Sequence, residues 1–109
     1  MPRDLILSTL IIATMPGPYS LDALVVAAPE QLSTTLGDDV VILGLRDTVY
    51  YGLSDTGTRI WQLLQTRRRV DEIATSIVGE YDVTIEQAIA DLQALLAELE
   101  ARGLVRIES

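Results

Sequence analysis

The sequence changes character at Ser54, and this change constrains the fold more than any other feature. Between residues 23 and 53, short runs of apolar, β-branched and aromatic residues are separated by Gly, Pro and Asp; the runs are residues 24–26, 31–36, 40–43 and 49–53. Such runs are typical of strands and hairpins. From Ser54 onward, apolar residues recur at helical spacing. Strands followed by helices predict an α+β domain, in which a three-stranded antiparallel sheet is followed by three helices as a winged helix-turn-helix.

The ends of the helices are marked by residues that satisfy free backbone groups. Ser54 predicts the N-cap of the first helix, with Asp55 in its first turn, where the helix dipole favours a negative charge. Thr84 and Gln87 predict a capping box at the start of the third helix. Gly103 predicts a left-handed residue just beyond the end of that helix. Residues 104–107 are then either a short terminal strand or an extended tail.

Residues 16–18, Pro-Gly-Pro, cannot continue a helix or a central strand. We therefore expect an N-terminal extension, residues 1–20, and one domain, residues 21–109, because a chain of 109 residues suits a single core. The apolar run of residues 5–15 is about half the length that spans a bilayer. We interpret it as an extra strand or a poorly ordered extension rather than a secretory signal, and expect a cytoplasmic protein that does not bind membranes.

The composition excludes most catalytic chemistry. The sequence has no cysteine, histidine or lysine, so thiol nucleophiles, imidazole bases and Schiff bases are excluded. We expect no enzyme activity, no catalytic residue, no metal and no cofactor. Sixteen acidic residues outweigh eight arginines, and the net charge of −8 repels nucleic acid. We interpret residues 67–69, three consecutive arginines, as a solvated loop between helices.

The third helix has a broad apolar face. Ala88, Leu92 and Leu95 belong to an apolar arc of roughly 120°, and Asp91 and Glu98 lie just beyond its edge. One interpretation is that this edge forms a wall of an apolar groove with carboxylates at its rim. The alternative is that the whole arc is ordinary core.

The run of residues 49–53 has neither a charge nor a proline, the residues that usually protect the edge of a sheet. An incoming peptide could therefore pair with this strand through its main chain, with alternate side chains entering pockets. The alternatives are that the strand lies inside the sheet or is covered by residues 1–20.

Residues 40–105 resemble the PqqD-like family, whose members are recognition elements for ribosomally synthesised and post-translationally modified peptides (RiPPs). The matching segments are Val40-Val41-Ile42-Leu43, Tyr50-Tyr51-Gly52-Leu53, residues 54–64 with Gly57-Thr58-Arg59-Ile60-Trp61, Val70-Asp71-Glu72-Ile73, Glu80-Tyr81-Asp82-Val83, residues 91–99 and Arg102-Gly103-Leu104-Val105. The order and joint spacing of these segments carry the resemblance, since each alone is a weak signal.

The resemblance implies a winged-helix domain that binds the leader of a precursor peptide as an added strand, in the groove between the third strand and the third helix. Carried over by position, the implied peptide-binding residues are Val49, Tyr50, Tyr51, Leu53, Ala88, Asp91, Leu92 and Leu95, with Glu98 at the rim. Stand-alone members of this size resemble the leader-binding proteins of lasso-peptide pathways, which serve a leader peptidase and a cyclase.

Three alternatives stay open. The first is the PqqD role itself, presenting a precursor for pyrroloquinoline quinone biosynthesis. The second is a winged-helix DNA-binding regulator, and the third is a structural subunit whose free edge pairs with a fixed partner. The resemblance also raises self-occlusion of the groove, because Tyr19 and Leu24 share the Tyr-to-Leu spacing of a lasso leader.

Overall fold

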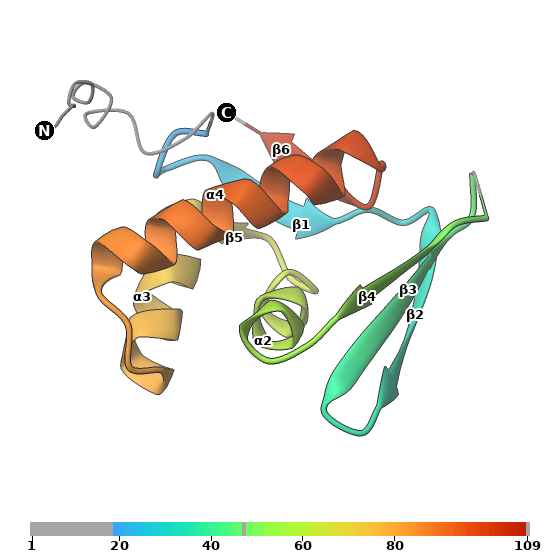
Figure 1. Cartoon of the computed structure of the whole chain (residues 1–109). Helices are drawn as coiled ribbons and strands as arrows, with labels where there is room; N and C mark the ends of the chain where they lie inside the picture. The colour runs from blue at the N-terminus through green and yellow to red at the C-terminus, as the bar shows by residue number, and fades with distance from the viewer. Residues whose placement is uncertain (1–18, 47, 109) are drawn as a thin grey trace, which may run out of the picture.

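The computed structural model describes residues 19–46 and 48–108, and all structural statements below refer to these residues. Three strands form one antiparallel sheet in the order β2-β3-β4, namely β2 (Gln31–Leu36), β3 (Asp39–Gly44) and β4 (Tyr50–Leu53). Three helices follow: α2 (Thr56–Leu63), α3 (Val70–Glu80) and α4 (Ile85–Ala101). The predicted α+β order of a three-stranded antiparallel sheet followed by three helices is confirmed, and it is compatible with a winged helix-turn-helix (Figure 1).

A second small sheet joins distant parts of the chain. In it, β1 (Leu24–Ala27) lies between β5 (Arg68–Arg69) and β6 (Val105–Glu108), antiparallel to both. The last segment is therefore a strand rather than a tail. The prediction of a plain loop at residues 67–69 was incomplete, because the backbone of Arg68 and Arg69 pairs with β1. The side chain of Arg67 is exposed and forms an ion pair with Glu108 at 3.1 Å.

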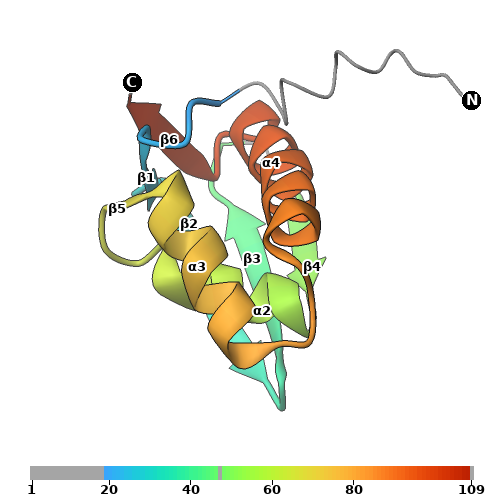
Figure 2. The ribbon, with the colours of Figure 1, turned by 90° about the vertical axis from the view of Figure 1, so that its left-hand side faces the viewer.

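The core lies among the helices, the inner face of the β2-β3-β4 sheet and strand β1 (Figure 2). Its largest fully buried side chains come from every layer: Val25, Ile42, Leu64, Val70, Ile73, Leu92, Leu96 and Leu99. Two polar side chains among the described residues, Thr58 and Gln93, are also buried, at 6% and 2% exposure. Helix α4 is thus held along its length by apolar packing.

The helix starts differ from the prediction in detail. Helix α2 begins one residue later than expected, with Asp55 rather than Ser54 at the N-cap. The backbone carbonyl of Ser54 accepts the amides of Gly57 and Thr58, while Asp55 takes an unusual φ of 53° and its side chain makes no capping bond. At α4, Thr84 Oγ1 accepts the amide of Gln87 as predicted. The reciprocal half of that capping box is absent here, since Gln87 Nε2 donates to Asp91 Oδ1 instead.

No helix in the described ranges combines the length and apolarity needed to cross a membrane.

Candidate functional site

Strand β4 lies at one end of its sheet, and no described segment pairs with its outer side. Its inner side pairs with β3 in a register that sets Tyr51 opposite Ile42 and Leu53 opposite Val40. Figure 2 shows that β4 is at the end of the sheet nearest α4. The predicted open edge is therefore present among the described residues.

The register identifies which backbone groups are free on this edge. The Gly44 amide donates to the Val49 carbonyl at 3.0 Å, one residue pair beyond the end of β4. In an antiparallel pair, hydrogen-bonded and non-bonded residue pairs alternate, and each residue points its N–H and C=O to the same side. Tyr51 and Leu53 therefore point these groups toward β3. The N–H and C=O groups of Tyr50 and Gly52 point outward.

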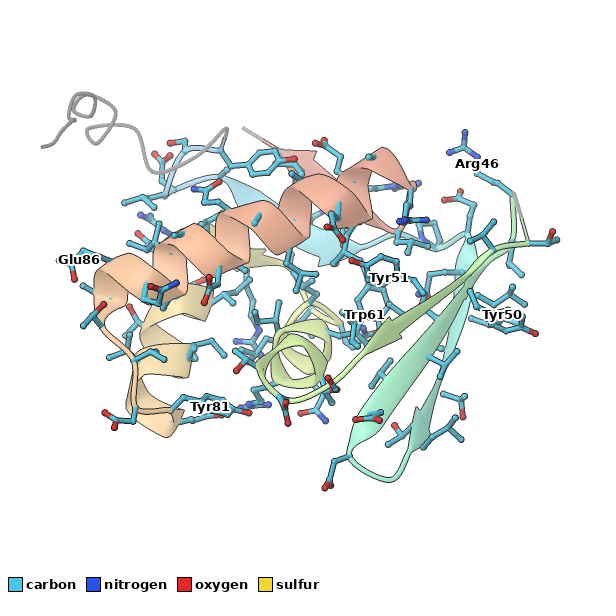
Figure 3. All side chains as sticks on the ribbon, viewed as in Figure 1. Arg46, Tyr50, Tyr51, Trp61, Tyr81 and Glu86 are labelled. Atoms are coloured by element: carbon cyan, nitrogen blue, oxygen red, sulfur yellow. The ribbon has the colours of Figure 1, made fainter. Side chains whose placement is uncertain are left out.

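The side chains of β4 divide between two faces of the sheet. Leu53 is 8% exposed and packs in the core, and Tyr51 is half-buried against that core. Tyr50 faces the opposite side and is 69% exposed. Val49 lies just before the strand and is 44% exposed. The predicted strand residues therefore differ in their surroundings: Tyr51 and Leu53 pack against the core, whereas Tyr50 does not. Figure 3 shows the side chain of Tyr51 on the side of α4.

On α4, the predicted residues also divide. Ala88 and Leu92 are buried in the core, at 4% and 0% exposure, so the core interpretation holds for them. Leu95 is half-buried, and Asp91 and Glu98 are exposed. Because residues three and four apart share a helix face, Asp91, Leu95 and Glu98 form one flank of α4. That flank continues one turn further, to Arg102.

The strand and the helix meet at Tyr51. Its hydroxyl donates a hydrogen bond to Glu98 Oε1, and the guanidinium of Arg102 lies over its ring, 4.9 Å from the centroid (Figure 3). Burial, the hydrogen bond to Glu98 and the charge of Glu98 all raise the pKa of Tyr51, while Arg102 lowers it. Glu98, predicted as a rim carboxylate, therefore already has a partner. The contacts of Tyr51 with Glu98 and Arg102 join β4 to the C-terminal end of α4.

The idea that Tyr19 and Leu24 occlude the groove is wrong. Tyr19 lies on the other flank of α4, where its amide donates to Gln93 Oε1 at 3.1 Å and its carbonyl accepts from Gln93 Nε2 at 2.8 Å. Its hydroxyl donates to Glu100 at 2.5 Å. Burial and then Glu100 raise the pKa of Tyr19 to about 12. Leu24 is part of β1 and pairs with Arg69 and Glu108.

Sequence reasoning missed two residues with specific contacts, Arg102 beside the site and Gln93 on the other flank of α4. Arg102 lies four residues after Glu98, so extending the α4 flank by one turn would have found it. Gln93 lies four residues after Ile89, and a polar residue at this position of an apolar stripe signals a buried amide that needs partners. Within the described ranges, no cluster of three or more acidic, histidine or cysteine side chains could hold a metal ion.

Comparison with known proteins decides the family. The family model described as coenzyme PQQ synthesis protein D (PqqD) matches residues 39–105, which is more than half of the chain. The chain belongs to the PqqD family. The matched region begins at β3 and ends at the start of β6, so it contains β4 and α4. No curated protein matched the sequence.

Two solved structures are similar to this chain over about three quarters of its length. One is described as TbiB1 in complex with the TbiA(beta) leader peptide; it is 33% identical with a TM-score of 0.71, covering 74% of this chain and 94% of that one. The other is described as lasso peptide synthetase B1 complexed with the leader peptide; it is 26% identical with a TM-score of 0.62, covering 75% of this chain and 96% of that one.

Proposed function

We propose that this PqqD-family chain captures the leader of a ribosomally synthesised precursor peptide as a strand added to the outer edge of β4, against the flank of α4. The observation that carries this proposal is the uncharged edge of β4 beside α4, with which no described segment pairs. The two similar solved structures, both described as leader-peptide complexes, support it.

The geometry indicates how such a peptide would be held. The outward N–H and C=O groups of Tyr50 and Gly52 would exchange hydrogen bonds with the incoming strand, which gives affinity without reading sequence. Side chains at alternate positions of the peptide would point inward, toward Tyr51 and Leu95. Of the residues that the family resemblance implies, Tyr50, Tyr51 and Leu95 are therefore the proposed direct contacts, while Leu53, Ala88 and Leu92 would support the groove from the core. Val49 and Asp91 lie at its ends.

The chain would act by binding alone. It would bring the precursor to a leader peptidase and then to a cyclase in the biosynthesis of a lasso peptide. The competing assignment is presentation of the precursor of coenzyme PQQ, which the family description favours. The two assignments differ in the peptide bound, so peptides from the two pathways distinguish them.

Gly52 offers a sharp test. A Cβ added at Gly52 meets no heavy atom within 4 Å, so Gly52→Ala keeps the amide and leaves the strand unstrained. Gly52→Pro removes the outward N–H and places its ring on the edge, and proline is tolerated at such edge positions. One net hydrogen bond is worth about 0.5–1.5 kcal/mol, so Gly52→Pro should weaken binding of the TbiA(beta) leader peptide by up to about tenfold.

The measurement is isothermal titration calorimetry of the full chain with that peptide, beside a precursor peptide of coenzyme PQQ synthesis. Gly52→Ala is the matched control and should bind like the unaltered protein. Equal affinity of the proline and alanine variants would contradict strand addition at β4. Binding of the PQQ precursor peptide alone would contradict the lasso assignment.

A further inference from the structure

Two arginines stand out at the point where β4 begins. Three other guanidiniums form ion pairs: Arg59 with Glu80 at 2.8 Å, Arg67 with Glu108 at 3.1 Å and Arg69 with Asp71 at 2.8 Å. The half-buried Arg68 donates to the backbone carbonyl of Leu63. Arg106 lies 3.8 Å from Glu30. Arg46 and Arg102 have no carboxylate within 4.0 Å among the described residues, in a chain with twice as many acids as arginines.

These two arginines share one cavity. A hollow of about 440 Å³ is lined by Arg46, Arg102 and Gly103, together with Glu100 and Ala101. Gly103 has a positive φ of 73°, and a Cβ added there would lie 3.2 Å from Arg46 Nη1. Arg46 thus lies close to Gly103, just beyond the end of α4. Arg102, the residue before Gly103, lines the same cavity. A second hollow of about 400 Å³ extends the site past Arg46 to Arg106.

Three carboxylates lie near these hollows, and among the described residues none is within 4.0 Å of either guanidinium. Glu100 accepts the hydroxyl of Tyr19, and Glu98, one turn before Arg102, accepts the hydroxyl of Tyr51. Glu30, which lines the second hollow, lies 3.8 Å from Arg106. Arg102 itself is fixed over the Tyr51 ring, which is a favourable cation–π arrangement. The arginines therefore present donors to any group that occupies the hollow. Arginine binds carboxylates with paired N–H groups, so the fitting ligand is a carboxylate.

The position of the cavity at the start of β4 indicates that the bound peptide supplies this carboxylate. Arg46 lies in the connection between β3 and β4, four residues before Tyr50, and Arg102 contacts Tyr51. A strand laid along the outer edge of β4 runs past Tyr50 and into this corner. Figure 3 shows Arg46 and Tyr50 toward the same end of the molecule, beyond Tyr51.

We propose that Arg46 and Arg102 form an acidic-residue subsite for the bound peptide, occupied by an Asp or Glu side chain just beyond the segment that pairs with Tyr50. This inference rests on the proposed function and adds the chemistry of one peptide position to it. The subsite fixes the register of the peptide in the groove, because the main-chain ladder alone would accept several registers.

The test pairs a peptide scan with arginine variants. Probes are TbiA(beta) leader peptides that carry a single glutamate at successive positions, each beside the same peptide with glutamine there. Affinities are measured by calorimetry with the full chain and its Arg46→Gln and Arg102→Gln variants. The control is Arg67→Gln, at an exposed arginine just before β5. Each variant is also titrated with the unmodified leader.

We expect glutamate to bind roughly two- to fivefold more tightly than glutamine in one short block of positions at one end of the pairing segment, the range of an exposed charge pair. Arg46→Gln should abolish this preference and Arg67→Gln should keep it. Added salt should reduce the preference as well. Arg102→Gln should abolish it too, even if loss of the Tyr51 contact lowers affinity for all peptides equally.

No preference for glutamate at any position would overturn the subsite, and so would a preference that survives in Arg46→Gln. The two failures of the account are distinguishable. Equal binding of all glutamate and glutamine peptides removes the subsite and leaves leader capture intact. Failure of every peptide to bind, the unmodified leader included, removes the proposed function and the subsite with it.

Discussion

Leu92 and Leu95, one turn apart on α4, allow the core and the proposed groove to be tested separately. Leu92 is fully buried, whereas Leu95 is half-buried on the flank that faces β4. Leu92→Ala should therefore destabilise the domain by about 2–5 kcal/mol, the usual cost of a cavity in a packed core. For a domain of this size that corresponds to a fall in Tm of roughly 10–25 °C.

Leu95→Ala should behave differently. Since much of its side chain is already in water, we expect a loss of about 1 kcal/mol in the free energy of unfolding. If the leader covers the rest of the side chain, burial on binding contributes a similar amount, and Leu95→Ala should weaken leader binding by roughly fivefold. Urea denaturation gives the first quantity and calorimetry with the TbiA(beta) leader peptide the second. A variant Leu95→Ala that loses as much stability as Leu92→Ala, yet binds the leader with unchanged affinity, would refute the assignment of this flank to the groove.

Three further predictions concern stability. Gly103→Ala should destabilise the domain by about 1–2 kcal/mol, because the positive φ disfavours a side chain and Arg46 must move. The control in the same denaturation series is Gly52→Ala, whose added Cβ meets no heavy atom within 4 Å. Equal losses of stability in the two variants would contradict this reasoning. The pKa of Tyr19 is raised to about 12 in the folded state from 10, so the unfolded chain loses this proton first and stability should fall as pH rises from 10 toward 12. Tyr19→Phe should flatten that part of the Tm-against-pH curve, and an unchanged slope would contradict the shift. Gln93→Leu removes both hydrogen bonds to the Tyr19 backbone; we expect a loss of about 1–3 kcal/mol and faster proteolysis near residue 20, and undiminished protease resistance would show that other contacts hold this segment.

The order of strands and helices could be predicted because it depends on local patterns. The runs of β-branched residues before Ser54 and the helical stripes after it each reflect their own periodicity, and Thr84 caps α4 as expected. The start of α2 was misplaced by one residue because Ser54 and Asp55 are both good capping residues, and the backbone geometry of the turn decides between them.

The second sheet could not be predicted, since it depends on pairing between distant segments. Leu24 pairs with Glu108, at the far end of the chain, and with Arg69 between two helices. Strand β5 is only two residues long, and the sequence pattern of neither β5 nor β6 indicates which strand it pairs with. The same limit explains why a plain loop was expected at residues 67–69.

The strand and the helix of the candidate site were predicted, but which of their residues are buried and which are accessible to a peptide was not. The resemblance to the family indicated the right strand and helix, but it grouped buried residues such as Leu92 with residues that a peptide can reach, such as Leu95. The outward amides could not be assigned from the sequence, because they depend on the register with β3. The contact of Tyr51 with Glu98 and Arg102 links residues about fifty positions apart, which no local pattern shows.

Amide hydrogen exchange on leader binding tests strand addition most directly. The sheet has a second edge at β2, where the register sets Ser33 opposite Ile42 and Thr35 opposite Val40, so the amides of Ser33 and Thr35 point outward there. Leader capture at β4 predicts that the amides of Tyr50 and Gly52 become protected when the TbiA(beta) leader peptide saturates the chain, while those of Ser33 and Thr35 do not change. Protection at Ser33 and Thr35 instead, or unchanged exchange at Tyr50 and Gly52 in the saturated complex, would contradict it.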